Sequence, residues 1–394
     1  MRSKRRPIGA RAERAPLPIG AAGIDSVPLR LSPDRVVLYG IALFVFGSLP
    51  ALLGHPGDWQ RFWAGGATVG TSALFNQGEH IAFQAAHGIG TGIWTYPPAF
   101  AWAFLPAAHL TVAVGYAVNF VFMLILVAFS GWILAGVFGF QRRFGVIAAL
   151  AWQPAIYSGD VGQISAIWLL LIALAMAGAA QGSSRIVGLA VGFMLLKPTI
   201  ALPFAGLLLV RKQWRACAVV AIFAGAWYLA SVAATAGEWS WIPHYVAVMR
   251  TLHDVDMGAV YNGITLPMIL IRLGIAQALA IAIGAIAFIC FLPALSRANV
   301  LLAMSCTSVL SLALSAHAWM YDATVVLPAL FYAMAKLAEP WRTRLIIAAY
   351  LLAALWMPID AAIRFNPLAI ITLGGAALCA VALYSKAKRQ QVVG

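Results

Sequence analysis

Asp58 is an acidic residue in an unexpected place. It follows the first long apolar run, in the stretch GHPGDWQRFWAGGATVG (54–70), although the chain has only 12 acidic residues among 394. A carboxylate there can cap a short helix, or it can act as a general base at the mouth of an apolar cavity. The two interpretations are compatible. Arg61, three residues on, is expected on the same helical face, either as an ion-pair partner of Asp58 or as an anchor for lipid headgroups.

Lys197 is the second candidate for chemistry. It lies inside the apolar run GFMLLKPTIALP (192–203), where insertion of a charge costs roughly 2.5 to 3.5 kcal/mol. A functional role is therefore favoured over a merely tolerated charge. A lysine ammonium can bind an anionic phosphate as a point charge.

Two shorter motifs place polar groups between apolar runs. The stretch YSGDVGQISAIW (157–168) carries Asp160 and Gln163, and is interpreted as a helix cap by Asp160 or as a polar turn that binds a hydroxylated substrate. The stretch TYPPAF (95–100) predicts a rigid turn. From that turn Tyr96 can direct its hydroxyl into a site.

A third cluster lies near the expected outer edge of a late apolar run. LSAHAWMYDATVVLP (314–328) contains His317, Trp319, Tyr321 and Asp322. His317 and Tyr321 are four residues apart, and we expect them to share a helix face. The clustering of polar and amphipathic groups at one membrane edge indicates a substrate-binding role, with packing as the alternative.

Metal ligation is not indicated by the remaining reactive residues. His253, Asp254 and Asp256 form a short acidic turn, which is more typical of a solvated loop than of a metal site. The cysteines lie inside apolar runs without CxxC spacing and are interpreted as packing residues: Cys217, Cys290, Cys306 and Cys379. We predict no metal, no cofactor and no disulfide framework.

The composition identifies the scaffold that must position these groups. Hydrophobic residues make up 63% and charged residues 10% of the chain, and the mean hydropathy is +0.89. Soluble domains are about a quarter charged. The runs are too long for the strands of an outer-membrane barrel. We therefore predict an all-α polytopic membrane protein.

About twelve apolar runs are expected to cross the bilayer. They lie near residues 36–54, 97–111, 113–138, 144–157, 161–180, 186–210, 214–236, 263–296, 298–316, 319–336, 343–358 and 366–384. Simple alternation puts most basic turns inside but leaves Arg142, Arg143 and Arg185 outside. If 97–111 is re-entrant and 186–210 breaks at Lys197, these arginines move inside. The sequence leaves both topologies open, and the broken one implies a cavity.

The charge distribution favours a membrane over nucleic acid. The net charge is +14, and many basic residues lie in the flanks, as the positive-inside rule predicts. We expect a disordered cytoplasmic arm (1–35) without a cleaved signal, one transmembrane domain (36–384) and a basic cytoplasmic tail (385–394). The predicted location is the inner (plasma) membrane, with both termini cytoplasmic. The outer segments 55–96 and 237–262 are rich in aromatics, which suits helices in the headgroup region.

The order of these motifs resembles that in the polyprenol-phosphate-mannose-dependent mannosyltransferases of glycosyltransferase family 87. The matching pieces are DWQRFWAGGATV, YPP, GQ, GLAVGFMLLKPTIALPFAGLLLVRKQWR and HAWMYD, within roughly residues 36–335. The resemblance implies a glycosyltransferase C-type fold, a site open to the outer face and a sugar donor carried on polyprenyl phosphate. The sequence departs from the family between 71 and 92, which bears on acceptor specificity more than on fold.

The resemblance also implies roles for the candidate residues. The family's catalytic carboxylate maps onto Asp58 as general base. Lys197, His317 and Arg61 would then face the lipid phosphate. The further predicted substrate-binding residues are Tyr96, Gln163, Tyr321 and Asp322. Direct displacement would invert the anomeric centre, and the acceptor is a glycolipid or glycan that the sequence does not identify.

Two alternatives remain on the sequence. One is a polytopic transporter or lipid flippase that uses Lys197 as a substrate counter-ion. The lack of a visible internal repeat and the two aromatic outer segments count against it. The other is a C-type transferase that uses an arabinosyl or glucosyl lipid. Sugar transfer to an acceptor would separate an enzyme from a transporter.

Overall fold

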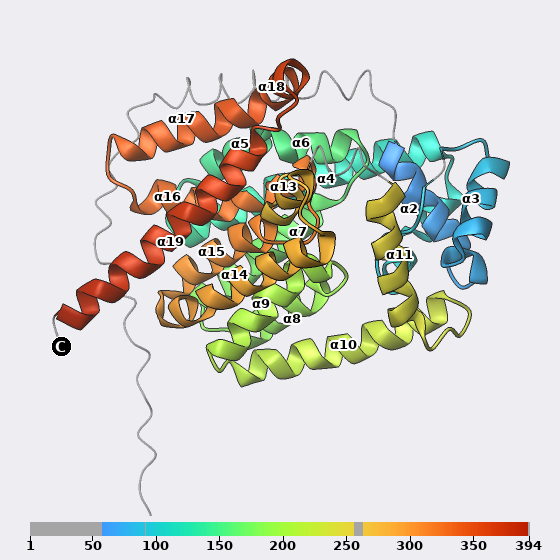
Figure 1. Ribbon diagram of the computed structural model, residues 1–394, viewed down its shortest axis with the longest axis horizontal. Coiled ribbons are helices and arrows are strands. Elements are labelled where there is room, and N and C mark those ends of the chain that lie inside the picture. Colours follow the sequence, from blue (N-terminus) through green and yellow to red (C-terminus); the bar gives the residue numbers. More distant parts are fainter. Residues whose placement is uncertain (1–56, 91, 256–262, 393–394) are drawn as a thin grey trace, which may run out of the picture.

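The computed structural model describes residues 57–90, 92–255 and 263–392, and this part of the chain is all-helical (Figure 1). The predicted arm and the first apolar run, 36–54, lie outside the described residues. The elements in chain order, with η for short 3-10 helices, are α2 (Gly57–Thr68), η1 (Ser72–Leu74), α3 (Gln77–Ala86), η2 (Pro98–Phe104), η3 (Ala107–His109), α4 (Val112–Phe138), α5 (Arg142–Leu150), α6 (Gln153–Asp160), α7 (Ser165–Ala180), α8 (Ser184–Met194), α9 (Pro198–Val210), α10 (Trp214–Ala234), α11 (Trp241–Val255), α13 (Leu266–Arg272), α14 (Gln277–Arg297), α15 (Val300–Ala313), η4 (Met320–Val326), α16 (Leu327–Lys336), α17 (Trp341–Ala354), α18 (Trp356–Ile363) and α19 (Leu368–Val392).

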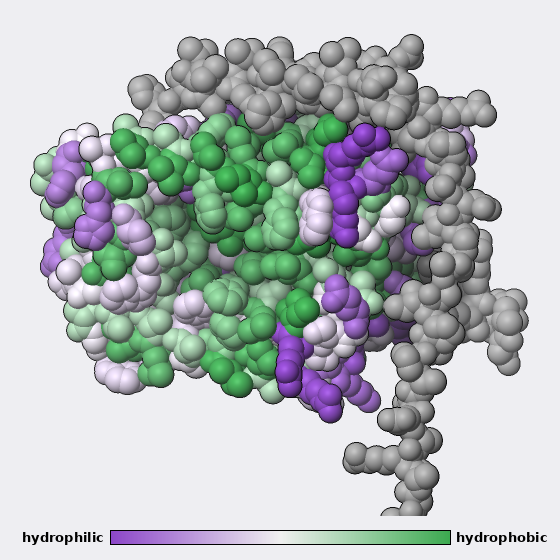
Figure 2. Space-filling view, turned by 180° about the vertical axis from the view of Figure 1, so that it is seen from behind, coloured by the Kyte–Doolittle hydropathy of each residue, from purple (hydrophilic) through white to green (hydrophobic). Residues whose placement is uncertain are grey.

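The prediction of a helical membrane protein is confirmed, whereas the count of twelve crossings is not. In the described part of the chain, three helices are long and apolar enough to cross a membrane: α4, α10 and α14. Figure 2 shows a broad apolar area on one face of the molecule, with hydrophilic residues toward both sides of it. This is the distribution expected for a protein whose middle zone faces lipid.

The run 97–111 does not form a membrane-spanning helix, which contradicts the simple alternation of twelve crossings but not the other predicted topology, in which this run does not cross. It forms η2, of 7 residues, and η3, of 3 residues. Pro97 and Pro98 begin the first piece and Pro106 separates the two, because proline cannot continue a helical hydrogen-bond ladder. At about 2.0 Å rise per residue, neither piece approaches the 30 Å of a bilayer core.

The run 186–210 is broken, as one of the two predicted topologies requires. Helix α8 ends at Met194 and α9 begins at Pro198, with Lys197 as its N-cap residue. A residue before proline is disfavoured in the α conformation, and Lys197 has φ −131° and ψ 84°. The break places the lysine at a helix end rather than on a helix face.

Helix α7 forms the centre of the bundle. Trp168, Leu169 and Ile172 are at most 1% exposed, and α7 packs against α4 and α8. Helix α4 begins at an N-cap threonine, Thr111, whose hydroxyl accepts from the Val114 amide at 3.3 Å. It ends at Gly139, which adopts the left-handed conformation with φ 79°.

Within the described residues, the two segments predicted to be outer contain the helices α2, α3 and α11, and many of the aromatics in the first segment are not at the surface. Trp59, Trp63, Phe75 and Trp94 are between 3% and 8% exposed, so these rings lie inside the protein, and the place of the two segments in the headgroup region stays a prediction. They pack α2, α3 and the segment after α3 onto the bundle instead. In Figure 1, α11 lies beside α2 and runs across the direction of α10. Trp239, just before α11, is 64% exposed.

Candidate active site

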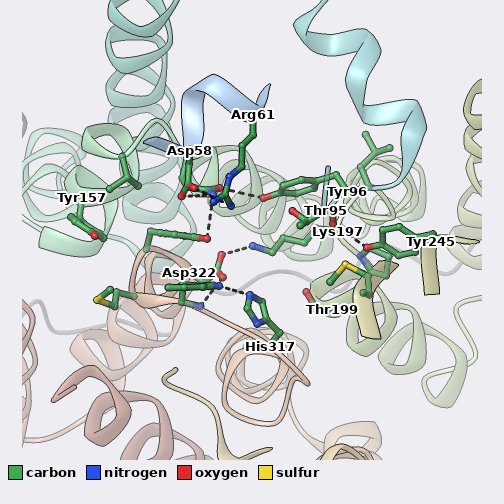
Figure 3. Close-up of a pocket in the computed structure, with 18 residues that line it drawn as sticks. Asp58, Arg61, Thr95, Tyr96, Tyr157, Lys197, Thr199, Tyr245, His317 and Asp322 are labelled. Atoms are coloured by element: carbon green, nitrogen blue, oxygen red, sulfur yellow. Dashed lines mark hydrogen bonds and ion pairs between the residues drawn. The ribbon is translucent and has the colours of Figure 1, made fainter. Parts of the chain in front are cut away.

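A pocket of about 270 Å³ opens between α2, the segment around Tyr96, the break before α9, α11 and η4 (Figure 3). All the site residues predicted from the sequence line it: Asp58, Arg61, Tyr96, Gln163, Lys197, His317, Tyr321 and Asp322. They come from five separate parts of the chain. The fold therefore brings the predicted set together.

Asp58 lies in the first turn of α2, where a negative charge is favourable. Its amide donates to the Val161 carbonyl at 3.1 Å, which ties α2 to the turn after α6. Its Oδ1 lies 3.4 Å from Arg61 Nη1, and the side chains of Asp58 and Arg61 are 21% and 40% exposed. Arg61 is thus the ion-pair partner of the carboxylate, as one of its two interpretations required.

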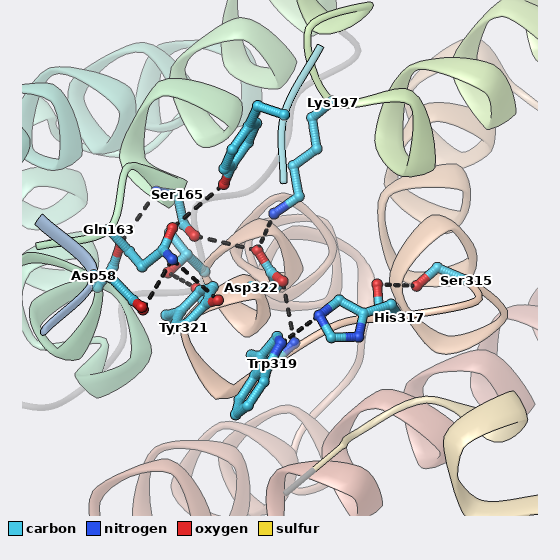
Figure 4. Close-up of polar contacts among 12 residues, drawn as sticks. Asp58, Gln163, Ser165, Lys197, Ser315, His317, Trp319, Tyr321 and Asp322 are labelled. Carbon is cyan, nitrogen blue, oxygen red and sulfur yellow. Dashed lines mark hydrogen bonds and ion pairs between the residues drawn. The ribbon is translucent and has the colours of Figure 1, made fainter. Parts of the chain in front are cut away.

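Gln163 connects the polar groups of the pocket (Figure 4). Its Nε2 donates to Asp58 Oδ2 at 2.9 Å and to the Tyr321 hydroxyl at 3.1 Å. Its Oε1 accepts from the Tyr96 hydroxyl at 3.3 Å. Burial, followed by the charges of Asp322 and Asp58, raises the pKa of Tyr96 well above its usual value. The Tyr96 hydroxyl therefore stays protonated and donates.

Gly162 explains why Gln163 can reach Asp58. Its φ is +76°, and a Cβ placed there would lie 2.4 Å from Trp59 Cβ and 2.8 Å from the Trp59 amide nitrogen. Only glycine permits both this conformation and this approach of α2. In the GQ motif, Gly162 thus allows the close contact with Trp59, and Gln163 binds the Asp58 carboxylate.

Lys197 forms an ion pair with Asp322 Oδ1. Asp322 also accepts from Ser165 Oγ at 3.3 Å and, through Oδ2, from the Trp319 amide at 3.1 Å. The side chains of Lys197 and Asp322 are 13% and 4% exposed. The carboxylate is thus enclosed by donors, whereas the ammonium has three protons and lines the pocket.

His317 lies in a non-helical segment before η4, so the predicted helix face shared with Tyr321 is wrong. The backbone at Trp319 is extended, with φ −105° and ψ 171°, and spacing by four residues does not align side chains there. Trp319 Nε1 donates to His317 Nε2. An indole N–H only donates, so a neutral His317 carries its proton on Nδ1. Trp319 also stacks on Tyr321, with ring centroids 6.4 Å apart.

Tyr245 of α11 is a lining residue that the sequence analysis did not select. Burial raises its pKa to about 12, and its hydroxyl donates to the Thr95 carbonyl at 3.3 Å. The only sequence signal that could have identified Tyr245 was its place among the aromatic residues of the segment 237–262. The remaining lining residues are Thr95, Tyr157, Val161, Leu196, Pro198, Thr199, Met249, Trp319 and Met320.

Asp160 and the acidic turn near 254 are not part of this pocket. Asp160 is the last residue of α6 and is 4% exposed, and neither of its carboxylate oxygens has a hydrogen-bond partner among the described residues. Burial raises its pKa to about 8. It therefore does not act as a helix cap. The side chains of His253, Asp254 and Asp256 lie outside those that the structure describes.

The site thus belongs to a membrane-embedded helical protein that presents a paired carboxylate and a cation to one pocket. The chain belongs to glycosyltransferase family 87, whose sequence model matches residues 94–316. It is therefore a membrane glycosyltransferase, which acts on a sugar donor and an acceptor, and this membership favours the enzyme over the transporter alternative. The match contains Tyr96, Gln163 and Lys197 but ends before His317. No curated protein matches the sequence significantly.

Proposed function

We propose that the protein transfers a hexose, in particular mannose, from a polyprenyl-phosphate sugar to an acceptor hydroxyl on the outer face of the inner membrane. The observation that carries this proposal is the Asp58 carboxylate. It lines the pocket, is held by Arg61 and Gln163, and shares the pocket with the Lys197 ammonium. Base and phosphate-binding cation are thus both available to one substrate complex.

In the proposed reaction, the acceptor oxygen attacks the anomeric carbon while the bond from that carbon to the phosphate oxygen breaks. Asp58 takes the proton from the acceptor hydroxyl. A carboxylate has about four acceptor positions, so the contacts to Arg61 and Gln163 leave room for the hydroxyl. Lys197 and Arg61 stabilise the negative charge of the departing polyprenyl phosphate, and His317, whose Nε2 accepts from Trp319, lines the pocket beside them. Attack opposite to the leaving group inverts the anomeric configuration.

The pocket size supports binding of the head of such a donor rather than its whole length. At about 270 Å³ it lies just below the usual range for ligand pockets, which begins at about 300 Å³. A sugar and a phosphate group fit that scale, whereas a polyprenyl chain must extend from it into lipid. Gln163, Tyr96 and Tyr321 orient the polar groups of the bound substrate. Asp322 keeps the Lys197 ammonium in place through their ion pair.

The test is the substitution Asp58→Asn in protein purified into nanodiscs. The introduced amide oxygen can still accept from Gln163, but it cannot take a proton. We expect transfer to fall by about 10² to 10⁴-fold, with thermal stability close to that of the wild type. Glu79→Gln, at an exposed carboxylate of α3 outside the pocket, is the matched control and should keep full activity.

The assay offers polyprenyl phosphates that carry mannose, glucose or arabinose with a panel of glycolipid acceptors, and products are identified by mass spectrometry. Transfer of mannose supports the donor assignment, and transfer of another sugar alone replaces it. Near-normal turnover by Asp58→Asn removes this residue from the role of base.

A further inference from the structure

The segment that follows α3 forms one wall of the pocket and is held by a buried amide. Gln84 of α3 is 0% exposed. Its Nε2 donates to the Gly92 carbonyl at 2.7 Å, and its Oε1 accepts from the Gly92 amide at 2.8 Å. Both hydrogen-bonding groups of one backbone residue are thus fixed by one side chain. Thr95 and Tyr96, a few residues further on, line the pocket.

Arg61 lies directly against the backbone that Gln84 holds. A Cβ placed on Gly92 would lie 2.2 Å from Arg61 Nε and 2.8 Å from Arg61 Cδ. The arginine stem therefore occupies the space beside Gly92 that a side chain would take. From this position its guanidinium reaches Asp58, with Nη1 at 3.4 Å from Oδ1.

We propose that Gln84 is a positioning residue: it fixes the Gly92 backbone, and this backbone keeps the Arg61 guanidinium on Asp58. An arginine that is 40% exposed has many rotamers available, and holding it against Asp58 costs side-chain entropy. A rigid wall beside the stem removes part of that freedom in advance. Gln84 and Gly92 precede the region matched by the family model, in the stretch where the sequence departs from the family pattern.

Two variants disturb the arrangement in different ways. Gln84→Met keeps the length of the side chain but removes both hydrogen bonds to Gly92. Gly92→Ala leaves those backbone bonds possible, but its new methyl group occupies the place of the Arg61 stem. If the inference is right, both variants release the Arg61 guanidinium from Asp58.

The control is His80→Leu, one turn earlier on the same helix. His80 is 1% exposed, and burial lowers its pKa to about 4, so the substitution removes no charge. It disturbs the packing of α3 near Thr68 Oγ1, which lies 3.5 Å from His80 Nδ1, without touching Gly92. A general loosening of α3 would appear in this variant as well.

The first readout is the rate at which phenylglyoxal modifies Arg61 in nanodiscs, measured by peptide mass spectrometry with Arg142 as internal reference. Because the ion pair is partly exposed and therefore weak, its loss should raise the rate only about threefold in Gln84→Met and Gly92→Ala. His80→Leu should match the wild type. An unchanged rate in Gln84→Met, or an equal increase in His80→Leu, overturns the inference.

The second readout concerns catalysis and rests on the proposed function. Gln84→Met should lower kcat about tenfold with little change in KM, and should have no further effect when Arg61→Met is already present. Additive losses in the double variant overturn the path through Arg61. Full activity of Asp58→Asn would contradict the proposed function, whereas the labelling result would still decide the role of Gln84.

Discussion

The charged residues of the pocket occur as two pairs of opposite sign, Asp58 with Arg61 and Lys197 with Asp322. The pairs differ in burial. The first is partly exposed and can exchange one partner for a substrate group at small cost. The second is almost buried, and removal of one partner leaves the other without compensation. A substitution at Lys197 therefore affects both stability and donor binding.

We predict that Lys197→Met lowers stability strongly, because it leaves the Asp322 side chain, which is 4% exposed, without its cation. Breaking a buried pair costs about 3 to 5 kcal/mol. The double variant Lys197→Met/Asp322→Asn should recover most of this loss, which thermal unfolding in detergent measures.

Donor binding separates the two roles of Lys197. If its ammonium binds the phosphate, the double variant should be stable yet fail to bind polyprenyl-phosphate sugar. If the double variant binds donor as the wild type does, the lysine only compensates Asp322. A Lys197→Met protein with unchanged thermal stability would contradict the structural importance of the pair.

At the level of elements, the turn between α6 and α7 joins the Asp58 carboxylate to the centre of the bundle. Val161 accepts from the Asp58 amide, Gly162 lies under Trp59, and Gln163 binds the carboxylate. Three consecutive residues thus define where α2 lies.

We predict that Gly162→Ala disrupts this junction. The methyl group would meet Trp59 at 2.4 Å, and φ +76° costs a non-glycine residue about 1 to 2 kcal/mol. Gly182 is a matched control, because it has φ +69° with nothing within 4 Å. Gly182→Ala should cost the conformational energy alone, whereas Gly162→Ala should also lower transfer by at least about tenfold. Equal activity of the two variants would show that the close approach to Trp59 is not needed.

Local sequence signals account for some elements of the site and not for others. The prolines at 97, 98 and 106 are the reason why the run 97–111 does not cross, and they are visible in the sequence. The site residues could be selected from the sequence because charges and amides are costly at membrane depth unless they have a role. All of them line one pocket in the structure. Their pairing was not predictable: Lys197 and Asp322 are 125 positions apart and Asp58 and Gln163 are 105 apart, and only tertiary packing decides such contacts.

On the scale of the whole molecule, the basic turns at Arg142, Arg185 and Arg211 lie at the end of the bundle remote from the pocket. Helix α4 begins beside α2, where Trp59 Nε1 donates to the Val112 carbonyl at 3.0 Å, and its 27 residues span about 40 Å before Arg142. Helix α9 begins at the pocket and ends at Arg211, which donates to carbonyls at the end of α14. The turn before Arg185 joins α7 and α8, both of which reach the pocket at their other ends.

Simple alternation of twelve crossings had left Arg142, Arg143 and Arg185 on the outer side, and this arrangement removes that difficulty. Because 97–111 does not cross, Arg142 and Arg143 lie on the same side as Arg211. From the positive-inside rule we therefore predict that this side is cytoplasmic and that the pocket opens to the outer face. A lipid-linked donor presented at the outer leaflet would have direct access to it.

We predict this orientation for a variant in which the four native cysteines are replaced by alanine. Ala86→Cys, on the exposed surface of α3, should react with a membrane-impermeant maleimide in intact spheroplasts, because α3 packs on α2 at the pocket end. Gln181→Cys, in the exposed turn between α7 and α8, should react only after permeabilisation, because that turn lies at the basic end. The opposite labelling pattern would place the pocket in the cytoplasmic half of the membrane. The sugar donor would then have to be presented at the inner leaflet.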